Sequence, residues 1–303
     1  MAGNKKVPKE QIYSREQLKK RARLFRLVSS FSPAGSIVSK KTIGKELLLP
    51  TEVGRVRVLT YNMESEQKLP LFINIHGGGF VIGSPEMDDP YLMNMAHQAN
   101  VKIISIDYSL SPEVIFPTAL NECYAVVKYA KQHAAELAID PENIAVGGHS
   151  AGGNLTAAIC LKNALAPEPE LNIKCIILDY PPLDLHSDAY LKPQPKGAIP
   201  PKMARMFDAC YTMDKEERLN PLVSPRYASL NDLKTFPPTL FLTAGHDSLL
   251  QEEEGFRDKL IEAGVELTYK CFENSYHGFT HSDKEDAVAG WQMMIDHLKR
   301  YLV

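Results

Sequence analysis

Residues 144–159 read IAVGGHSAGGNLTAAI, and this stretch decides the fold. An apolar run of strand length, 144–146, leads into the pattern G-x-S-x-G, and residues of helical character come directly after it. A strand that turns sharply into a helix at one serine strains the backbone of that serine and leaves no room for side chains beside it. The pattern occurs often by chance, but its placement makes Ser150 a candidate nucleophile, with Gly148 and Gly152 as its supporting glycines.

A second glycine-rich segment follows another apolar run. Residues 71–75 read LFINI and are followed directly by HGGGF, residues 76–80. Consecutive glycines leave backbone N–H groups unobstructed, and such groups can stabilise the oxyanion of a tetrahedral intermediate together with the N–H of Ala151. A phosphate-binding loop is the competing interpretation, but neither GxGxxG nor GxxxxGK follows this run.

A serine hydroxyl becomes a good nucleophile when an imidazole accepts its proton and a carboxylate orients that imidazole. In chains with this strand–serine–helix turn, the acid and then the histidine come later, on loops after late strands. Asp247 and His277 each follow a late apolar run, so both fall where this order predicts. Asp184, which follows the run 173–179, is the alternative acid.

The other histidines are weaker candidates for the base because of their positions. His149 adjoins Ser150 and cannot easily turn back onto it. His277 and His281 resemble a metal-binding H-x-x-x-H pair, but Gly278 stands where a zinc hydrolase has its glutamate, so no metal is predicted. The remaining histidines lie in predicted helices, beside Asp247 or in a predicted lid: His97, His133, His297, His246 and His186.

Short apolar runs alternate with helical stretches from about residue 44, which is typical of a parallel α/β sheet flanked by helices. The expected strands are 71–75, 102–106, 143–147, 173–179, 239–243 and 266–272. The clearest helices are 118–135, 152–165 and a C-terminal helix whose apolar stripe comprises Val288, Trp291, Ile295, Leu298 and Leu302.

Two segments interrupt this alternation. Residues 10–30 predict an amphipathic helix that packs on the domain, with an apolar face formed by Leu18, Ala22, Phe25 and Val28. Residues 185–236 are rich in Pro, Met, Lys and Asp and are too long for an ordinary crossover. They follow a strand, so they can fold over the carboxyl edge of the sheet. We therefore expect a cap from 1–43 and 185–236 on a catalytic domain of 44–303.

Composition excludes several classes of protein. A chain of 303 residues can bury a core without disulfides or metals. Its net charge of -3 offers no broad basic surface for nucleic acid, and its five scattered cysteines form no CxxC pair. The N-terminus lacks a secretory apolar stretch and no run is long enough to span a bilayer. These features predict a cytoplasmic protein without membrane insertion that acts on a small or neutral substrate.

With these residues in place, the sequence resembles the hormone-sensitive-lipase-like family of α/β-hydrolases, which includes many bacterial carboxylesterases. The resemblance covers most of 45–303. Beyond the two glycine-rich motifs it is carried by Asp107–Glu113 (DYSLSPE, for the family's DYRLAPE), Tyr180-Pro181, Ala244–Leu249 (AGHDSL, for AGxDxL) and His277-Gly278-Phe279. Three residues depart from the family: His149 replaces an acidic residue, Ser109 an arginine and Ser111 an alanine. The loss of the acid and the arginine together indicates a changed local ion pair.

The resemblance implies an α/β-hydrolase fold with a cap, no cofactor, and hydrolysis of small, short-chain acyl esters through a serine acyl-enzyme. It implies a triad of Ser150, Asp247 and His277. It assigns the oxyanion N–H groups to Gly78, Gly79 and Ala151, in motifs completed by His76, Gly77, Gly148 and Gly152. A homodimer through the edge strand 266–272 is also implied. A noncatalytic small-ligand receptor, and an amidase or peptidase with the same triad, are the alternatives.

Overall fold

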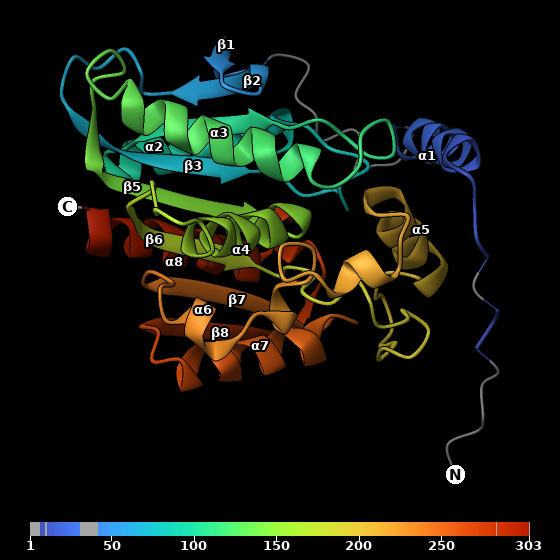
Figure 1. The fold of residues 1–303 in the computed structure, drawn as a ribbon. Helices are drawn as coiled ribbons and strands as arrows, with labels where there is room; N and C mark the ends of the chain where they lie inside the picture. Colours follow the sequence, from blue (N-terminus) through green and yellow to red (C-terminus); the bar gives the residue numbers. More distant parts are fainter. Residues whose placement is uncertain (1–6, 10, 31–41, 283, 303) are drawn as a thin grey trace.

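A single eight-stranded sheet forms the centre of the computed structural model, which describes residues 7–9, 11–30, 42–282 and 284–302 (Figure 1). Its strand order is β1-β2-β4-β3-β5-β6-β7-β8, parallel from β4 to β8 and antiparallel at the β1–β2 and β2–β4 pairs. The strands are β1 Lys45–Thr51, β2 Gly54–Tyr61, β3 Leu69–Ile75, β4 Lys102–Asp107, β5 Ile139–His149, β6 Ile173–Asp179, β7 Thr239–His246 and β8 Leu267–Tyr276. All six predicted strands are present, and β1 and β2 extend the sheet at one edge.

Helices cover both faces of this sheet (Figure 1). The helices are α1 Arg15–Ser30, α2 Asp89–Ala99, α3 Thr118–Gln132, α4 Ala151–Ala164, α5 Pro201–Tyr211, α6 Leu230–Leu233, α7 Leu250–Glu262 and α8 Glu285–Leu302. One face carries α3, α4, α6 and α7, and the other carries α2 and α8, which contact each other. In the described chain, none of these helices is both long enough and apolar enough to cross a membrane.

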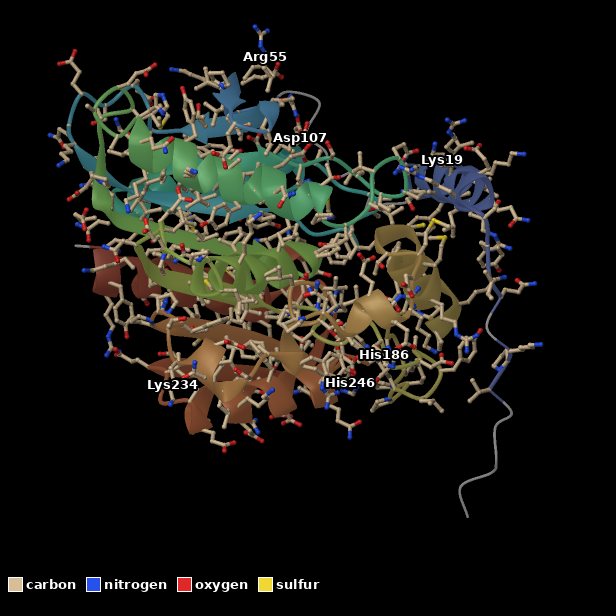
Figure 2. The ribbon with its side chains drawn as sticks, viewed as in Figure 1. Lys19, Arg55, Asp107, His186, Lys234 and His246 are labelled. Carbon is tan, nitrogen blue, oxygen red and sulfur yellow. The ribbon has the colours of Figure 1, made fainter. Side chains whose placement is uncertain are left out.

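The central strands are buried on both faces, which explains why the sequence shows continuous apolar runs there. Successive residues of a strand point to opposite faces. In β3, Leu71 and Ile73 therefore pack in the core under α3 and α4, whereas Phe72 packs in the core under α2 and α8. Figure 2 shows side chains filling the space between the sheet and both helical layers.

Two residues of the predicted apolar stripes are exposed. Val288 is 68% exposed and Val28 is 62% exposed, although Trp291 in the first stripe and Leu18 and Ala22 in the second are buried. Val288 lies in the first turn of α8 and Val28 in the last turn of α1, and among the described residues nothing buries either side chain. Each apolar stripe correctly predicts which face of its helix is buried. It does not predict how far along the helix that face is covered.

The two segments predicted to form a cap meet beside the sheet (Figure 1). α1 contacts α5, and Leu18 and Ala22 form a small buried cluster with Val81 and Cys210. The later part of the insertion differs, because α6 packs against α4 and α7 and its Leu233 belongs to the main core. The insertion thus has one part beside α1 and one part on the sheet's helical layer.

The turn between β5 and α4 has the predicted strand–serine–helix form. Ser150 stands between them with φ 51° and ψ −117°, a strained backbone for a residue with a side chain. A Cβ on Gly148 would lie 2.4 Å from the carbonyl carbon of Gly152, and a Cβ on Gly152 would lie 1.9 Å from the carbonyl oxygen of Ile75. Both glycines are therefore fixed by contact between backbones.

This contact predicts opposite effects for two glycine-to-alanine substitutions. Gly152→Ala must displace the backbone at Ile75, so the free energy of unfolding should fall by at least about 2 kcal/mol. Gly255 lies within α7 with no atom within 4 Å of an added Cβ. Gly255→Ala should raise the free energy of unfolding by about 0.5–1 kcal/mol, because alanine favours a helix. Urea unfolding measures both, and equal effects would contradict the contact.

Candidate active site

The candidate catalytic residues meet at the carboxyl edge of the parallel sheet. Ser150 follows β5, Asp247 follows β7 and His277 follows β8, while the HGGGF segment follows β3. In parallel α/β sheets this edge is where ligands bind, because the loops after neighbouring strands converge there. The backbone N–H of Ser150 donates to the carbonyl of Asp179 at 2.8 Å, which ties the serine to the end of β6.

Hydrogen bonds link the three predicted triad side chains in sequence. His277 Nε2 lies 2.8 Å from Ser150 Oγ, and His277 Nδ1 lies 2.6 Å from Asp247 Oδ2. Asp247 is buried, and its other oxygen accepts the backbone N–H of Leu249 at 3.1 Å. With Nδ1 donating to the carboxylate, Nε2 is left free to accept a proton from the serine hydroxyl.

The surroundings of His277 favour its protonated form. Burial lowers the pKa of His277, but the negative charge of Asp247 and the hydrogen bond to it more than offset that effect. The net result is a raised pKa, which makes the imidazole a stronger base toward the hydroxyl of Ser150.

The HGGGF loop bends through conformations that favour glycine. Gly78 has φ 114° and Gly79 has φ 59°. A Cβ on Gly78 would meet the carbonyl oxygen of Ile82 at 2.0 Å, and one on Gly79 would meet the ring of Phe207 at 2.5 Å. Both glycines line the same cavity as Ser150, so the loop brings unobstructed backbone close to the candidate nucleophile.

His76 and Gly77 hold this loop in place. His76 is buried, and burial lowers its pKa, so the neutral ring donates from Nδ1 to the carbonyl of Gly77 at 2.7 Å. The ring stacks on Tyr108 with centroids 4.2 Å apart, and the Tyr108 hydroxyl donates to the carbonyl of His76 at 3.1 Å. A Cβ on Gly77 would approach the carbonyl of His149 to 3.1 Å, so this glycine permits the close approach of the two loops.

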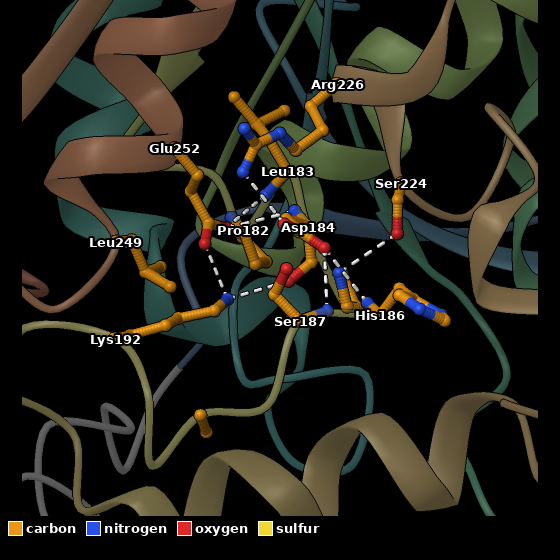
Figure 3. A network of polar contacts seen from close by, with 12 residues as sticks. Pro182, Leu183, Asp184, His186, Ser187, Lys192, Ser224, Arg226, Leu249 and Glu252 are labelled. Atoms are coloured by element: carbon orange, nitrogen blue, oxygen red, sulfur yellow. Dashed lines mark hydrogen bonds and ion pairs between the residues drawn. The ribbon is translucent and has the colours of Figure 1, made fainter.

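Asp184, the alternative acid, has other partners (Figure 3). Its Oδ1 accepts from the hydroxyl of Tyr227 at 3.0 Å and from the backbone N–H groups of His186 and Ser187 at 3.1 and 2.9 Å. Its Oδ2 pairs with Arg226 at 2.9 Å. The carboxylate of Asp184 thus organises the loop after β6, while the carboxylate hydrogen-bonded to His277 is that of Asp247.

Two histidine–aspartate pairs beside the triad were not found from the sequence. His149 Nδ1 lies 2.6 Å from Asp179 Oδ2, and His281 Nε2 lies 2.6 Å from Asp88 Oδ1. Burial lowers the pKa of His149, but Asp88 and Asp179 more than offset it, and the net pKa is raised. Two buried carboxylates thus favour the charged form of His149, which accounts for a histidine in place of the family's acidic residue.

Asp88, His149 and His281 bring three possible metal ligands together, with ligand atoms within 4.8 Å of one another. Zinc holds its ligands at about 2.0–2.1 Å in a tetrahedron, which places the ligand atoms about 3.3 Å apart. His281 and Asp88 lie closer than that and bond to each other. The H-x-x-x-H pair is also divided, because His277 faces Ser150 while His281 faces Asp88.

The departure at Ser109 has a direct structural explanation. Its hydroxyl and its backbone N–H both donate to the carboxylate of Glu122, at 2.7 and 2.6 Å. The short side chain therefore lets α3 hold the loop through backbone and hydroxyl together. No polar contact accounts for serine rather than alanine at 111.

A cavity of about 230 Å³ opens beside Ser150 and His277. Its walls come from the HGGGF loop, the loops after β6 and β7, α1 and α5. Most of the lining is apolar and includes Phe25, Ile82, Met203, Phe207 and Leu249. An ester placed here would have its carbonyl next to the serine and one of its substituents in an apolar chamber.

Known proteins share this fold and sequence. A family model described as alpha/beta hydrolase fold matches residues 72–281. An AB hydrolase superfamily protein of Schizosaccharomyces pombe is 31% identical over 215 residues, which are 69% of this chain and 62% of that protein. This chain therefore spans less than two thirds of that relative. An arylesterase of Saccharolobus solfataricus is 29% identical over 82% of this chain and 81% of its own length.

A solved structure extends the likeness to three dimensions. Carboxyl esterase 2 of Tuber melanosporum superimposes with a TM-score of 0.80 at 30% identity, covering 88% of each chain. The match over 72–281 takes in the HGGGF loop, the nucleophile turn and the residues after β8. The chain belongs to the α/β-hydrolase fold family, which confirms the predicted fold class and the resemblance to its hormone-sensitive-lipase-like members.

Proposed function

We propose that this protein is a serine carboxylesterase that hydrolyses small, short-chain acyl esters. The observation that carries the proposal is the unbroken chain of hydrogen bonds from Ser150 through His277 to Asp247. The esterases among its relatives and structural neighbours support the reaction class. No feature of the site requires a cofactor for this chemistry.

In the proposed reaction, Ser150 Oγ attacks the ester carbonyl while its proton passes to His277 Nε2. Asp247 keeps the imidazole oriented and stabilises the positive charge that forms on it. The imidazolium then protonates the departing alcohol, leaving an acyl group on Ser150. A water molecule, deprotonated by His277, releases the acid in the second half of the reaction.

The negative charge in both steps falls on the former carbonyl oxygen. We assign its stabilisation to the N–H groups of Gly78, Gly79 and Ala151. The glycine loop supports this assignment because its positive φ angles and tight contacts fix the backbone before substrate binds. Donors that are already oriented need not rearrange as charge develops, which is the main source of their effect.

We also propose that α1 and the part of the insertion around α5 act as the cap, since Phe25 and Phe207 both line the cavity. Pairing of β8 with a second copy stays a prediction, supported by its position at the edge of the sheet. Sedimentation velocity tests it. The predicted cytoplasmic location likewise stays a prediction.

The first prediction concerns the nucleophile. Ser150→Ala removes the only atom that can form the proposed acyl-enzyme, so kcat for p-nitrophenyl butyrate should fall by about 10,000-fold or more. A serine-reactive phosphonate should label the unchanged protein at Ser150, as read by peptide mass spectrometry. Labelling elsewhere, or turnover close to the unchanged rate in Ser150→Ala, would refute the mechanism. A folded protein that binds a ligand but hydrolyses no ester or anilide would support the receptor alternative.

The second prediction concerns pH. The base must be unprotonated to accept the serine proton, so kcat/KM should fall as the pH drops through the pKa of His277, above the usual value of 6.5. Asp247→Asn removes the charge that raises this pKa, so the midpoint should move to lower pH as kcat falls by about 10,000-fold. Asp184→Asn is the matched comparison, because Asp184 does not contact His277. A larger loss in Asp184→Asn would reverse the assignment of the acid.

The third prediction concerns chain length. The ring of Phe207 lies against Gly79 and packs edge-on against Phe25 with centroids 5.5 Å apart. Phe207→Ala should lengthen the cavity and raise the ratio of kcat/KM for p-nitrophenyl octanoate over butyrate by at least about tenfold. Met206→Ala, at a neighbouring residue of α5 that packs beside α1 and does not line this cavity, should leave the ratio unchanged. An unchanged ratio in Phe207→Ala would place the acyl chain elsewhere.

A further inference from the structure

One carboxylate in the cavity beside Ser150 has no role in the proposed reaction. Asp208 lies on α5, whose Met203, Ala204 and Phe207 also line this cavity. These positions fall on one face of a helix, so the side chain of Asp208 belongs to the inner wall. α1 packs along an adjoining side of α5, where Ala22 and Cys210 share one buried cluster, and this packing helps to hold α5 in place.

The neighbouring charges are already engaged with one another (Figure 3). Lys192 pairs with Glu252 at 2.5 Å and donates to the backbone carbonyl of Asp184 at 2.7 Å. The carboxylate of Asp184 is paired with Arg226. In the parts of the chain that the structure describes, no hydrogen bond or ion pair reaches the carboxylate of Asp208.

The surroundings of Asp208 disfavour its ionised form. Burial raises the pKa of Asp208 to about 7, although the positive charges of Lys192 and Arg218 act in the opposite direction. Glu252 and Asp184 add further negative charge nearby and raise the pKa. A carboxylate in a mostly apolar chamber is best stabilised by a cationic hydrogen-bond donor brought by the ligand.

We propose that Asp208 binds a protonated amine on the substrate, so that the natural esters carry an ammonium group on the part that enters the cavity. This inference rests on the proposed esterase function and names its substrate class. Ser150 and Asp208 line the same cavity, so a single small aminoalkyl ester can reach both. An alkyl ester of the same shape would instead leave Asp208 dehydrated and unpaired.

The test compares two pairs of esters that differ only in replacing a CH by a protonated N. One pair varies the alcohol: dimethylaminoethyl acetate against isopentyl acetate. The other varies the acid: methyl dimethylaminobutyrate against its carbon analogue. In at least one of the two pairs, the wild-type enzyme should hydrolyse the amine ester with a kcat/KM about 10- to 100-fold higher than that of its carbon analogue. Asp208→Asn should remove that preference. Asp214→Asn, an exposed carboxylate outside this cavity on the same segment, is the matched control and should retain it.

The pH dependence gives a readout that needs no variant. As pH rises from about 6 to about 8, Asp208 loses its proton, so the preference for the ammonium ester should increase in the unchanged enzyme. In Asp208→Asn this preference should not change with pH. The inference would be overturned if the kcat/KM ratio of amine ester to carbon analogue were the same in the wild-type enzyme and in Asp208→Asn for both pairs, and did not change with pH.

A second measurement separates this inference from the esterase function. Calorimetric binding of the four esters to Ser150→Ala protein compares the same pairs without turnover. If no ester is hydrolysed but the amines bind more tightly through Asp208, the proposed reaction fails and the amine site stands. If esters are hydrolysed but the amine gains nothing in turnover or binding, the amine site fails alone.

Discussion

The close contact of three backbone segments at the end of β5 constrains the rest of the structure. Gly148, Gly152 and the carbonyl of Ile75 approach so tightly that no side chain fits between them. This contact turns the chain at Ser150 and directs its hydroxyl away from the sheet. Because β5 lies between β3 and β6, the HGGGF loop and the loop after β6 flank the serine on either side. The acid and base then arrive from β7 and β8, further along the same edge.

Features that depend on residues adjacent in the sequence could be predicted from the sequence alone. The turn at Ser150, the six strands and the places of Asp247 and His277 each depend on a run of apolar residues and on the residues directly after it. Strand ends were less predictable where burial stops. β8 continues to Tyr276 through Glu273 and Asn274, polar residues that an edge strand tolerates and an apolar run does not reveal. Val288 shows the converse, because an apolar residue at the end of a stripe need not have a partner.

Contacts between distant parts of the chain left no sequence signal. His281 bonds Asp88 across 193 residues, and His149 bonds Asp179 on the neighbouring strand. A histidine before the nucleophile is simply a departure from the family until these partners are placed around it. Once placed, it fills a position between two buried carboxylates that an acidic residue would destabilise by repulsion. The substitution therefore belongs to a rearranged set of charges beneath the site, while the triad keeps its geometry.

The reacting groups and the recognition of substrate come from different parts of this fold. The proposed triad residues follow strand ends, whose positions the sheet determines, whereas α5 and α1 form much of the cavity wall. The composition of 185–236 does not reveal which of its acidic residues face inward. Asp188 pairs with Arg205 away from the cavity, while Asp208, three residues after Arg205, faces into it. The packing of Leu18 and Ala22 against α5 is one of the contacts that set which way the residues of α5 face. Substitutions in α1 should therefore change the preference among ester substrates more than they change the rate of the chemical step.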